Sequence, residues 1–269
     1  MDTRPVVLVT GAGQRIGREI ALHLAAQGWG VAVHYRQSAA AAVQTVAQIV
    51  TQRGRAQAFC ADLADEADCE ALLPAVRQAM GPVAAVVNNA SLFEHDDVAS
   101  FSLARMDRHW RANTAPAILL ARALHAQLAA GEQGVVVNVL DQKLWNPNPD
   151  HLSYSLSKAA LQYATTVLAQ ALAPSLRVCA VAPGVTLHSG DMNDAEFKAS
   201  QRMTPLQRSS TPHDVAQAVH YLLQASAVTG TTLLVDGGQH LQAQARDVMF
   251  LARERLPLAA AADSHSKVT

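Results

Sequence analysis

Short runs of apolar residues alternate along the chain with longer stretches whose pattern is typical of helices. Most runs are apolar at every position, as expected of strands covered on both faces of a sheet. The runs lie at residues 6–10, 31–35, 56–60, 83–88, 135–139, 178–182 and 231–235. The helical stretches lie at residues 15–27, 39–53, 65–80, 103–130, 153–173 and 213–224. This alternation predicts a doubly wound α/β fold in which a seven-stranded parallel sheet is flanked by helices.

Glycine and proline mark the expected ends of several helices. Gly28, Gly54 and Gly81 follow the first three helical stretches, and glycine commonly ends a helix because it adopts the left-handed conformation without strain. A break near Pro116 would divide the fourth stretch, because proline lacks the amide hydrogen that a helix interior uses.

No linker or low-complexity segment divides the chain, so we expect one domain over residues 1–240. Residues 241–269 are expected to form a C-terminal extension, with a short helix at 243–255 and a frayed end at 259–269. The segment 185–210 is polar and is expected to be an irregular lid over the substrate, with His188, Asp191 and Met192 as candidate lining residues. Residues 145–149 are a second candidate wall, or simply a rigid turn.

Composition excludes several classes of protein. Half of the 269 residues are hydrophobic and the net charge is −1, which argues against both disorder and nucleic-acid binding. The most apolar long stretch, 112–130, is interrupted by Arg122 and His125, so no membrane span is expected. The chain opens on a strand and not on a signal sequence, which favours a soluble, cytoplasmic protein.

Cysteine and histidine usage gives no sign of a metal site. The three cysteines have no CxxC spacing, and the histidines form no HExxH motif. We expect reduced thiols and no bound metal.

A glycine-rich turn follows the first strand. Its glycines, Gly11, Gly13 and Gly17, have G-x-G-x-x-x-G spacing between a predicted strand and a predicted helix. In that position Gly11 would allow a tight turn, Gly13 the approach of a pyrophosphate, and Gly17 close helix packing. This placement favours dinucleotide binding over a plain turn.

The end of the second strand indicates which dinucleotide. It reads His34, Tyr35, Arg36, Gln37, Ser38 and contains no acid to hold a ribose 2′-hydroxyl. Arg36 and Ser38 suit a 2′-phosphate, so we expect NADPH as the cofactor. A solvated surface arginine is the alternative interpretation.

Tyr154 and Lys158 are four residues apart and therefore share one face of a helix. A nearby ammonium lowers the pKa of a tyrosine, which would make Tyr154 an effective general acid, and Lys158 could also hold the nicotinamide ribose.

With these motifs the chain resembles the short-chain dehydrogenase/reductase family, whose members have a Rossmann fold. The matching residues are T-G-A-G-Q-R-I-G at 10–17, Asp62-Leu63, Asn88-Asn89-Ala90, Asn113, Tyr154 with Lys158, Pro183-Gly184 and Asp236-Gly237-Gly238. The resemblance implies that Asn113 holds a water connecting Lys158 to solvent. It also implies a homotetramer. The sequence alone supports only an apolar helical face, at 112–130 and 153–173, which would form a dimer interface or pack in the core. The implied cofactor-binding residues are Gly11, Gly13, Arg15, Ile16, Gly17, Tyr35, Arg36, Ser38, Asp62, Leu63, Asn89, Ala90, Ser91, Tyr154, Lys158, Pro183 and Gly184.

One position departs from the family pattern. The family usually has a serine after the fifth strand to hold a substrate carbonyl, but this chain has Asp141 there, thirteen residues before Tyr154. An ionised carboxylate only accepts hydrogen bonds, so Asp141 suits a substrate rich in N–H donors. A helix cap or a degenerate site is the alternative for Asp141.

The arrangement of Asp141, Tyr154 and Lys158 is similar to that of the pteridine reductase branch, which includes dihydromonapterin reductases. Arg15, the 34–38 segment and Phe93 agree with that branch, Phe93 lying where an aromatic ring would stack on a pterin. The resemblance implies hydride transfer from NADPH to a pterin C=N bond, with the proton from Tyr154 or from a water polarised by Asp141 and Tyr154. Asp141 disfavours a tyrosinate whereas Lys158 favours it, so the two form a coupled site in which no pKa is assigned to either alone. The proposed substrate-binding residues are Arg15, Phe93, Asp141 and Tyr154, and the proposed catalytic residues are Asp141, Tyr154, Lys158 and Asn113. A general carbonyl or 3-oxoacyl reductase and a non-enzymatic NADP(H)-sensing module are the competing hypotheses.

Overall fold

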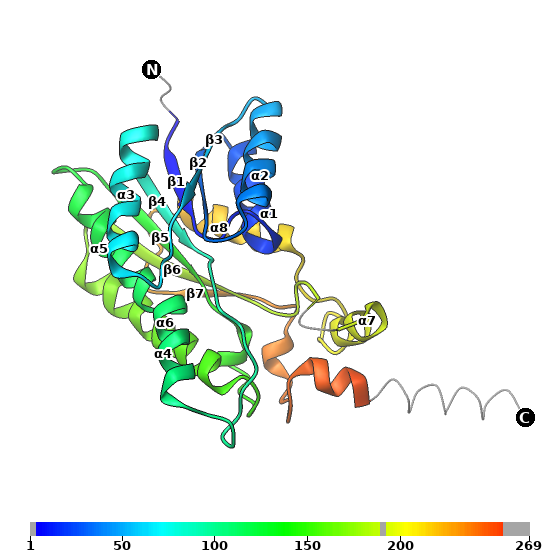
Figure 1. Ribbon diagram of the computed structural model, residues 1–269. Coiled ribbons are helices and arrows are strands. Elements are labelled where there is room, and N and C mark those ends of the chain that lie inside the picture. The colour runs from blue at the N-terminus through cyan, green and yellow to red at the C-terminus, as the bar shows by residue number, and fades with distance from the viewer. Residues whose placement is uncertain (1–3, 189–191, 255–269) are drawn as a thin grey trace, which may run out of the picture.

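The computed structural model describes residues 4–188 and 192–254. Seven parallel strands form one sheet in the order β3-β2-β1-β4-β5-β6-β7 (Figure 1), as the sequence predicts. The order reverses between β1 and β4, which is where doubly wound sheets bind their ligands. The strands are β1 Val6–Val9, β2 Gly30–Tyr35, β3 Arg55–Cys60, β4 Val83–Asn88, β5 Gly134–Val139, β6 Leu176–Pro183 and β7 Thr232–Val235.

Helices cover both faces of the sheet, and each face has its own core. Helices α1 Arg15–Ala26, α2 Ala39–Thr51 and α8 Pro212–Gln224 pack on one face. Helices α3 Glu66–Met80, α5 Ala115–Gln127 and α6 Leu152–Ala171 pack on the other. Helices α4 Leu103–Asn113 and α7 Asp194–Arg202 contribute no residue to either of these two cores.

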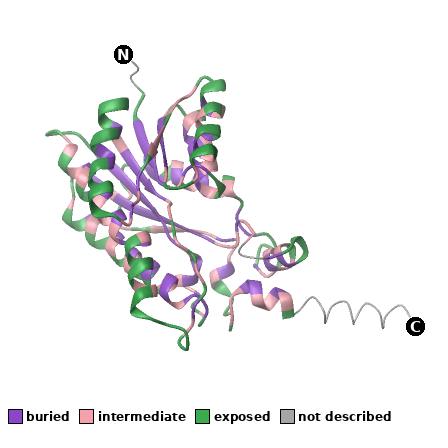
Figure 2. Ribbon diagram, viewed as in Figure 1, coloured by how far each residue is buried: buried purple, intermediate pink, exposed green. Residues whose placement is uncertain are grey.

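Alternate residues of each central strand contribute to opposite cores. Val7 and Val9 of β1 lie in the core with α1 and α8, whereas Val6 and Leu8 lie in the core with α3 and α5. This is why the central strands β1, β4, β5 and β6 are almost entirely apolar, and Figure 2 shows them buried along most of their length.

The chain breaks between α4 and α5 at Thr114, and Pro116 lies in the first turn of α5. The expected break near Pro116 is therefore confirmed, because a proline there loses no helical hydrogen bond. Two of the three expected glycine helix ends are confirmed by the positive φ angles of Gly28 and Gly81, 90° and 85°. After α2 the expectation is wrong, because Arg53 and not Gly54 takes the left-handed conformation, at φ 63°. Gly54 has a different role: a Cβ there would lie 2.6 Å from Ile49 Cγ2, so a larger residue would not fit.

Helix α7 corrects the expectation that residues 185–210 are irregular throughout. It begins with a capping box in which Asn193 Oδ1 accepts from the Glu196 amide at 3.0 Å and Glu196 Oε2 accepts from the Asn193 amide at 3.0 Å. The N-x-x-E spacing that makes this box is present in the sequence and would have predicted the helix start.

The C-terminal segment starts its helix later than expected, at residue 248 instead of 243, because Gln244 and Arg246 instead bond across to Asn146 and Asp150. Val248 and Ala252 are buried against the body of the protein. The expected frayed end at 259–269 lies outside the described residues. Within the part of the chain that the structure describes, no helix has the length and apolarity to cross a membrane.

Candidate active site

A cleft of about 760 Å³ opens at the carboxyl ends of the strands, where the strand order reverses. Most residues that the sequence singles out line it together. Of the predicted site residues, those lining the cleft are Gly11, Arg15, Ile16, Gly17, Tyr35, Arg36, Ser38, Asp62, Leu63, Asn89, Ala90, Ser91, Phe93, Asp141, Tyr154, Lys158, Pro183 and Gly184.

The glycine-rich turn between β1 and α1 is held from two sides. Gly11 has a φ of 63°, which favours glycine, and its amide donates to His34 Nδ1 at 3.1 Å. His34 Nε2 lies 3.1 Å from the Ala61 carbonyl, so this nitrogen carries the hydrogen. Burial lowers the pKa of His34, which keeps the ring neutral and able to accept at Nδ1. The sequence predicted no contact between His34 and this turn, and the structure shows that the ring joins the turn to the Ala61 carbonyl.

Gly17 and Asn89 hold the other side of the turn. A Cβ at Gly17 would lie 2.3 Å from the Gly11 carbonyl oxygen and 2.4 Å from Asn89 Nδ2, so only glycine fits there. Asn89 Nδ2 donates to the Thr10 carbonyl at 2.9 Å. The turn thus keeps the shape that a pyrophosphate needs, and the first turn of α1 faces the cleft.

Gly13 has a packing role that the sequence did not predict. A Cβ there would lie 3.1 Å from the Ala42 amide nitrogen and 3.3 Å from Ser38 Oγ, so the absence of a side chain allows the turn to approach the start of α2. Gly13 does not line the cleft, and its expected role toward a pyrophosphate stays a prediction.

The far end of the cleft carries Arg36 after β2. Its side chain is about half exposed, and Nη1 lies 3.9 Å from Asp62 Oδ1 across the cleft wall. Such a loose, exposed contact holds the guanidinium weakly. Arg36 and Ser38 can therefore turn toward a phosphate, and together with the turn these residues fit a dinucleotide that carries one.

The three central residues of the site meet at the end of β5. Asp141 directly follows that strand, and Tyr154 and Lys158 lie one turn apart on α6. The Tyr154 hydroxyl donates to Asp141 Oδ2 at 2.9 Å, and the Lys143 amide donates to Oδ1 at 2.8 Å. Lys158 Nζ donates to the Val139 carbonyl at 2.7 Å.

The structure decides between two opposing effects on Tyr154 that the sequence left in balance. Burial, and then the neighbouring Asp141 carboxylate, raise the pKa of Tyr154 well above its usual value, so the lowering expected from Lys158 does not prevail. The reason is geometric: Asp141 bonds the hydroxyl, while Lys158 Nζ is 5.8 Å from the ring centre and bonds a carbonyl. Burial raises the pKa of Asp141 and lowers that of Lys158 to about 8. Tyr154 is therefore a neutral phenol that carries a proton at neutral pH.

Asn113 does not line the cleft but lies behind it. Its Nδ2 donates to Ser157 Oγ at 2.9 Å and to the Leu92 carbonyl at 3.0 Å, and its Oδ1 accepts from the Leu92 amide at 2.7 Å and from Ser91 Oγ. Both amide hydrogens and both acceptor positions are used. The side chain holds the loop after β4 against α6. A water held by Asn113 would therefore have to bond to the backbone of this residue and not to its side chain.

Phe93 lies beside Tyr154 in the cleft. Its ring stacks on His151 with centres 4.2 Å apart and meets the Tyr154 ring edge-on at 4.6 Å. His151 has a φ of 58°, is buried, and has no partner for Nε2. One face of the Phe93 ring is thus fixed by His151, and 42% of the residue remains exposed.

The predicted lid contacts the glycine-rich turn. Arg15, at a φ of 55°, donates from Nη2 to the His188 carbonyl at 2.8 Å. The His188 ring stacks on Phe197 of α7 with centres 4.3 Å apart, and Met192 lines the cleft and is buried. Asp191 lies outside the described residues. The other candidate wall, 145–149, forms a turn outside the cleft lining.

Comparison with known proteins gives one matching family profile and several similar proteins, of which three are described. A family profile described as enoyl-(acyl carrier protein) reductase matches residues 11–240. FolM alternative dihydrofolate reductase 1 from Brucella suis, solved with NADP, is 38% identical with a TM-score of 0.86, covering 91% of this chain and 98% of that one. Pteridine reductase 1 of Leishmania tarentolae is 31% identical, covering 89% of this chain and 97% of that protein. The 3-oxoacyl-[acyl-carrier-protein] reductase of Synechocystis is also 31% identical, covering 88% of this chain and 97% of that protein.

Proposed function

The chain belongs to the short-chain dehydrogenase/reductase family, and on that premise we propose that it is an NADPH-dependent reductase of a pterin or dihydropterin ring. The observation that carries the proposal is the carboxylate of Asp141 at the end of β5, bonded to the Tyr154 hydroxyl. A ketone oxygen needs hydrogen-bond donors, and an ionised carboxylate offers none. A pterin ring carries amino and ring N–H groups that suit this acceptor.

The proposed cofactor is NADPH. The turn at Gly11 and Gly17 would hold its pyrophosphate, and Arg36 with Ser38 would hold the 2′-phosphate. Lys158 would hold the nicotinamide ribose. When bound, this cofactor supplies the hydride for the reaction.

The protein's own residues would orient the ring and deliver the proton. Phe93 offers its exposed face for stacking, and Asp141 accepts hydrogen bonds from the ring edge. A hydride adds to the carbon of a ring C=N bond and a proton adds to the nitrogen, so the product is CH–NH. The proton comes from the Asp141–Tyr154 pair, directly from the phenol or through a water that the two residues polarise. Because the raised pKa of Tyr154 keeps the phenol protonated, the proton is available at neutral pH.

The test is a substrate panel followed at the NADPH absorbance band. Dihydrobiopterin, dihydromonapterin and dihydrofolate are compared with a simple ketone and a 3-oxoacyl thioester. We expect oxidation of NADPH with at least one dihydropterin and a much lower kcat/KM for both carbonyl substrates. Turnover of the 3-oxoacyl thioester alone would identify the protein as a carbonyl reductase and refute the proposal.

The variant Asp141→Ser sharpens the same test, because it replaces the acceptor by a hydroxyl donor. We expect it to lose dihydropterin turnover and to gain turnover of the ketone. If the variant keeps the parent's preference, Asp141 does not select the substrate.

A further inference from the structure

The C-terminal segment, drawn in orange to red in Figure 1, follows β7 along the chain. Some of its residues form part of the wall of the active-site cleft. The cleft that contains Asp141 and Tyr154 is also lined by Asp247 and Val248 of this segment, and by Gln239 just before it. The cleft therefore contains a second carboxylate next to the proposed catalytic pair. Its charge is close enough to raise the pKa of both Asp141 and Tyr154.

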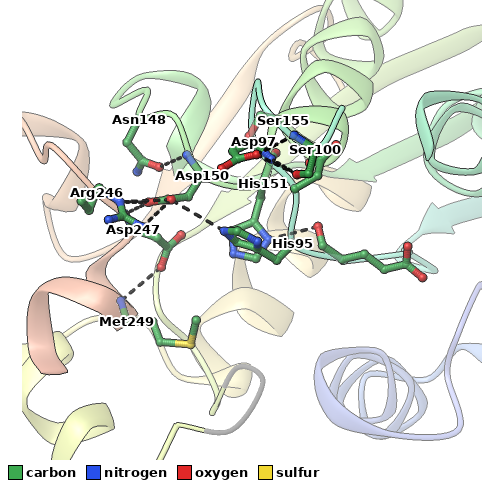
Figure 3. Close-up of polar contacts among 12 residues, drawn as sticks. His95, Asp97, Ser100, Asn148, Asp150, His151, Ser155, Arg246, Asp247 and Met249 are labelled. Carbon is green, nitrogen blue, oxygen red and sulfur yellow. Dashed lines mark hydrogen bonds and ion pairs between the residues drawn. The ribbon is translucent and has the colours of Figure 1, made fainter. Parts of the chain in front are cut away.

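The segment is anchored by Asp150, which precedes α6. Arg246 donates from Nη2 to Asp150 Oδ1 at 2.9 Å and from Nε to Oδ2 at 2.9 Å, so the guanidinium binds the carboxylate with two hydrogens (Figure 3). The Asp247 amide also donates to Asp150 Oδ2, at 2.8 Å. His95 Nε2 lies 3.8 Å from Oδ1 of the same carboxylate. These contacts hold the backbone at Asp247 in one place.

The side chain of Asp247 is held by a buried lysine. Lys143 Nζ donates to Asp247 Oδ2 at 3.1 Å, and only 4% of the Lys143 side chain is exposed. The backbone amide of the same residue bonds Asp141 Oδ1. A single residue thus joins both carboxylates, one through its amide and one through its ammonium.

Asp247 keeps acceptor capacity toward the cleft. Its Oδ1 accepts from the Met249 amide at 3.1 Å and its Oδ2 accepts from Lys143, which leaves each oxygen one further acceptor position. The side chain is 22% exposed. If Asp247 only capped the helix that begins at residue 248, or only paired with Lys143, its side chain would not need to line the cleft.

We propose that Asp247 is a second substrate-binding residue, which accepts a hydrogen bond from the amino group of the substrate ring, beside the ring N–H that faces Asp141. This inference rests on the proposed function. Two neighbouring carboxylates match a ring edge that bears an amino group next to a ring N–H, as in an aminopyrimidinone. Each hydrogen bond to a carboxylate adds selectivity for that edge over rings without the amino group.

The experiment uses two variants of the full chain. Asp247→Asn keeps the size of the side chain and its ability to cap the following turn but removes the charge. Because that change leaves buried Lys143 without its counter-ion, the double variant Asp247→Asn with Lys143→Gln restores a neutral hydrogen-bonding pair. Asp97→Asn, a matched charge change on a partly exposed residue outside the cleft lining, is the control.

We expect both Asp247 variants to raise KM for a dihydropterin by about 10- to 100-fold, the usual effect of losing a hydrogen bond to a charged group. For an analogue without the 2-amino group, the KM should change by less than about threefold, and Asp97→Asn should match the parent. A purely structural role would change KM for both substrates equally.

Parental KM in the folded double variant, or an equal loss for the analogue, would overturn this role for Asp247 alone. Absence of dihydropterin turnover in the unmodified enzyme would instead overturn the proposed function, and with it this inference. Thermal denaturation of each variant shows whether a lost activity reflects unfolding.

Discussion

Raising the pH above 8 should switch the enzyme off through Lys158. This residue is 2% exposed, and burial lowers its pKa from 10.5 to about 8, while the charge of Asp141 raises it. This lowering of the pKa means that the protein disfavours the charged form of Lys158 relative to the neutral form by roughly 3 kcal/mol. Lys158 is proposed to bind the ribose of an anionic cofactor, so loss of its charge should weaken productive binding of NADPH.

The assay measures kcat/KM for NADPH between pH 6 and pH 10. The pH dependence of this ratio reflects the pKa values of groups in the free enzyme. We expect a constant value below pH 7, about half of it at pH 8, and a tenfold fall for each further pH unit. Asp141→Asn removes the charge that raises the pKa of Lys158, so the fall should begin at a lower pH in that variant. Lys198→Gln, which changes an exposed lysine on α7, should leave the profile unchanged.

Unfolding would not explain such a loss. The folded pKa of Lys158 is below its unfolded value, so the unfolded chain binds more protons between pH 8 and 10.5. The Lys158 contribution to the free energy of unfolding therefore increases across this window while activity falls. A kcat/KM that stays constant to pH 10, or a fall that moves to higher pH in Asp141→Asn, would refute the assignment.

Three further changes test other parts of the site and fold. Tyr154→Phe removes the proposed proton source, and steady-state kinetics should show kcat lower by about 10²- to 10⁴-fold, while a fluorescence titration gives an NADPH Kd within about threefold of the parent. Gly17→Ala places a methyl group 2.3 Å from the Gly11 carbonyl oxygen, so urea unfolding should show a loss of about 1–3 kcal/mol and NADPH binding should weaken more than tenfold. Burial lowers the pKa of His23 and of His220 below 6.5, so the unfolded chain binds more protons and the free energy of unfolding should decrease as the pH falls below about 6.5. Urea titrations at pH 5, 6 and 7 should show a flatter dependence for His23→Gln, and an unchanged dependence would contradict this origin.

The sheet and the cleft could be predicted because their signals are local. A strand that is buried on both faces is apolar at every position, and a glycine-rich turn between strand and helix has one main use. The same holds for Tyr154 and Lys158, since a spacing of four on a helix places them on one face.

The remaining parts depend on contacts that sequence spacing does not reveal. Asp247 lies more than a hundred residues from Lys143 and Asp141, and only the folded chain brings them together. The direction of the Tyr154 pKa shift depends on whether its hydroxyl meets a carboxylate or an ammonium, and the spacing of the residues along the chain does not decide this. The packing role of Gly13 could not be predicted for the same reason, because it depends on the approach of α2.

The most direct test of the proposed function follows the hydride itself. The enzyme is incubated with NADPH that carries deuterium at the transferable position of the nicotinamide, together with a dihydropterin, and the product is examined by mass spectrometry and NMR. The account predicts a tetrahydropterin with one deuterium on the ring carbon of the former C=N bond. Recovery of unlabelled dihydropterin, with deuterium transferred only when a carbonyl substrate is supplied, would contradict it.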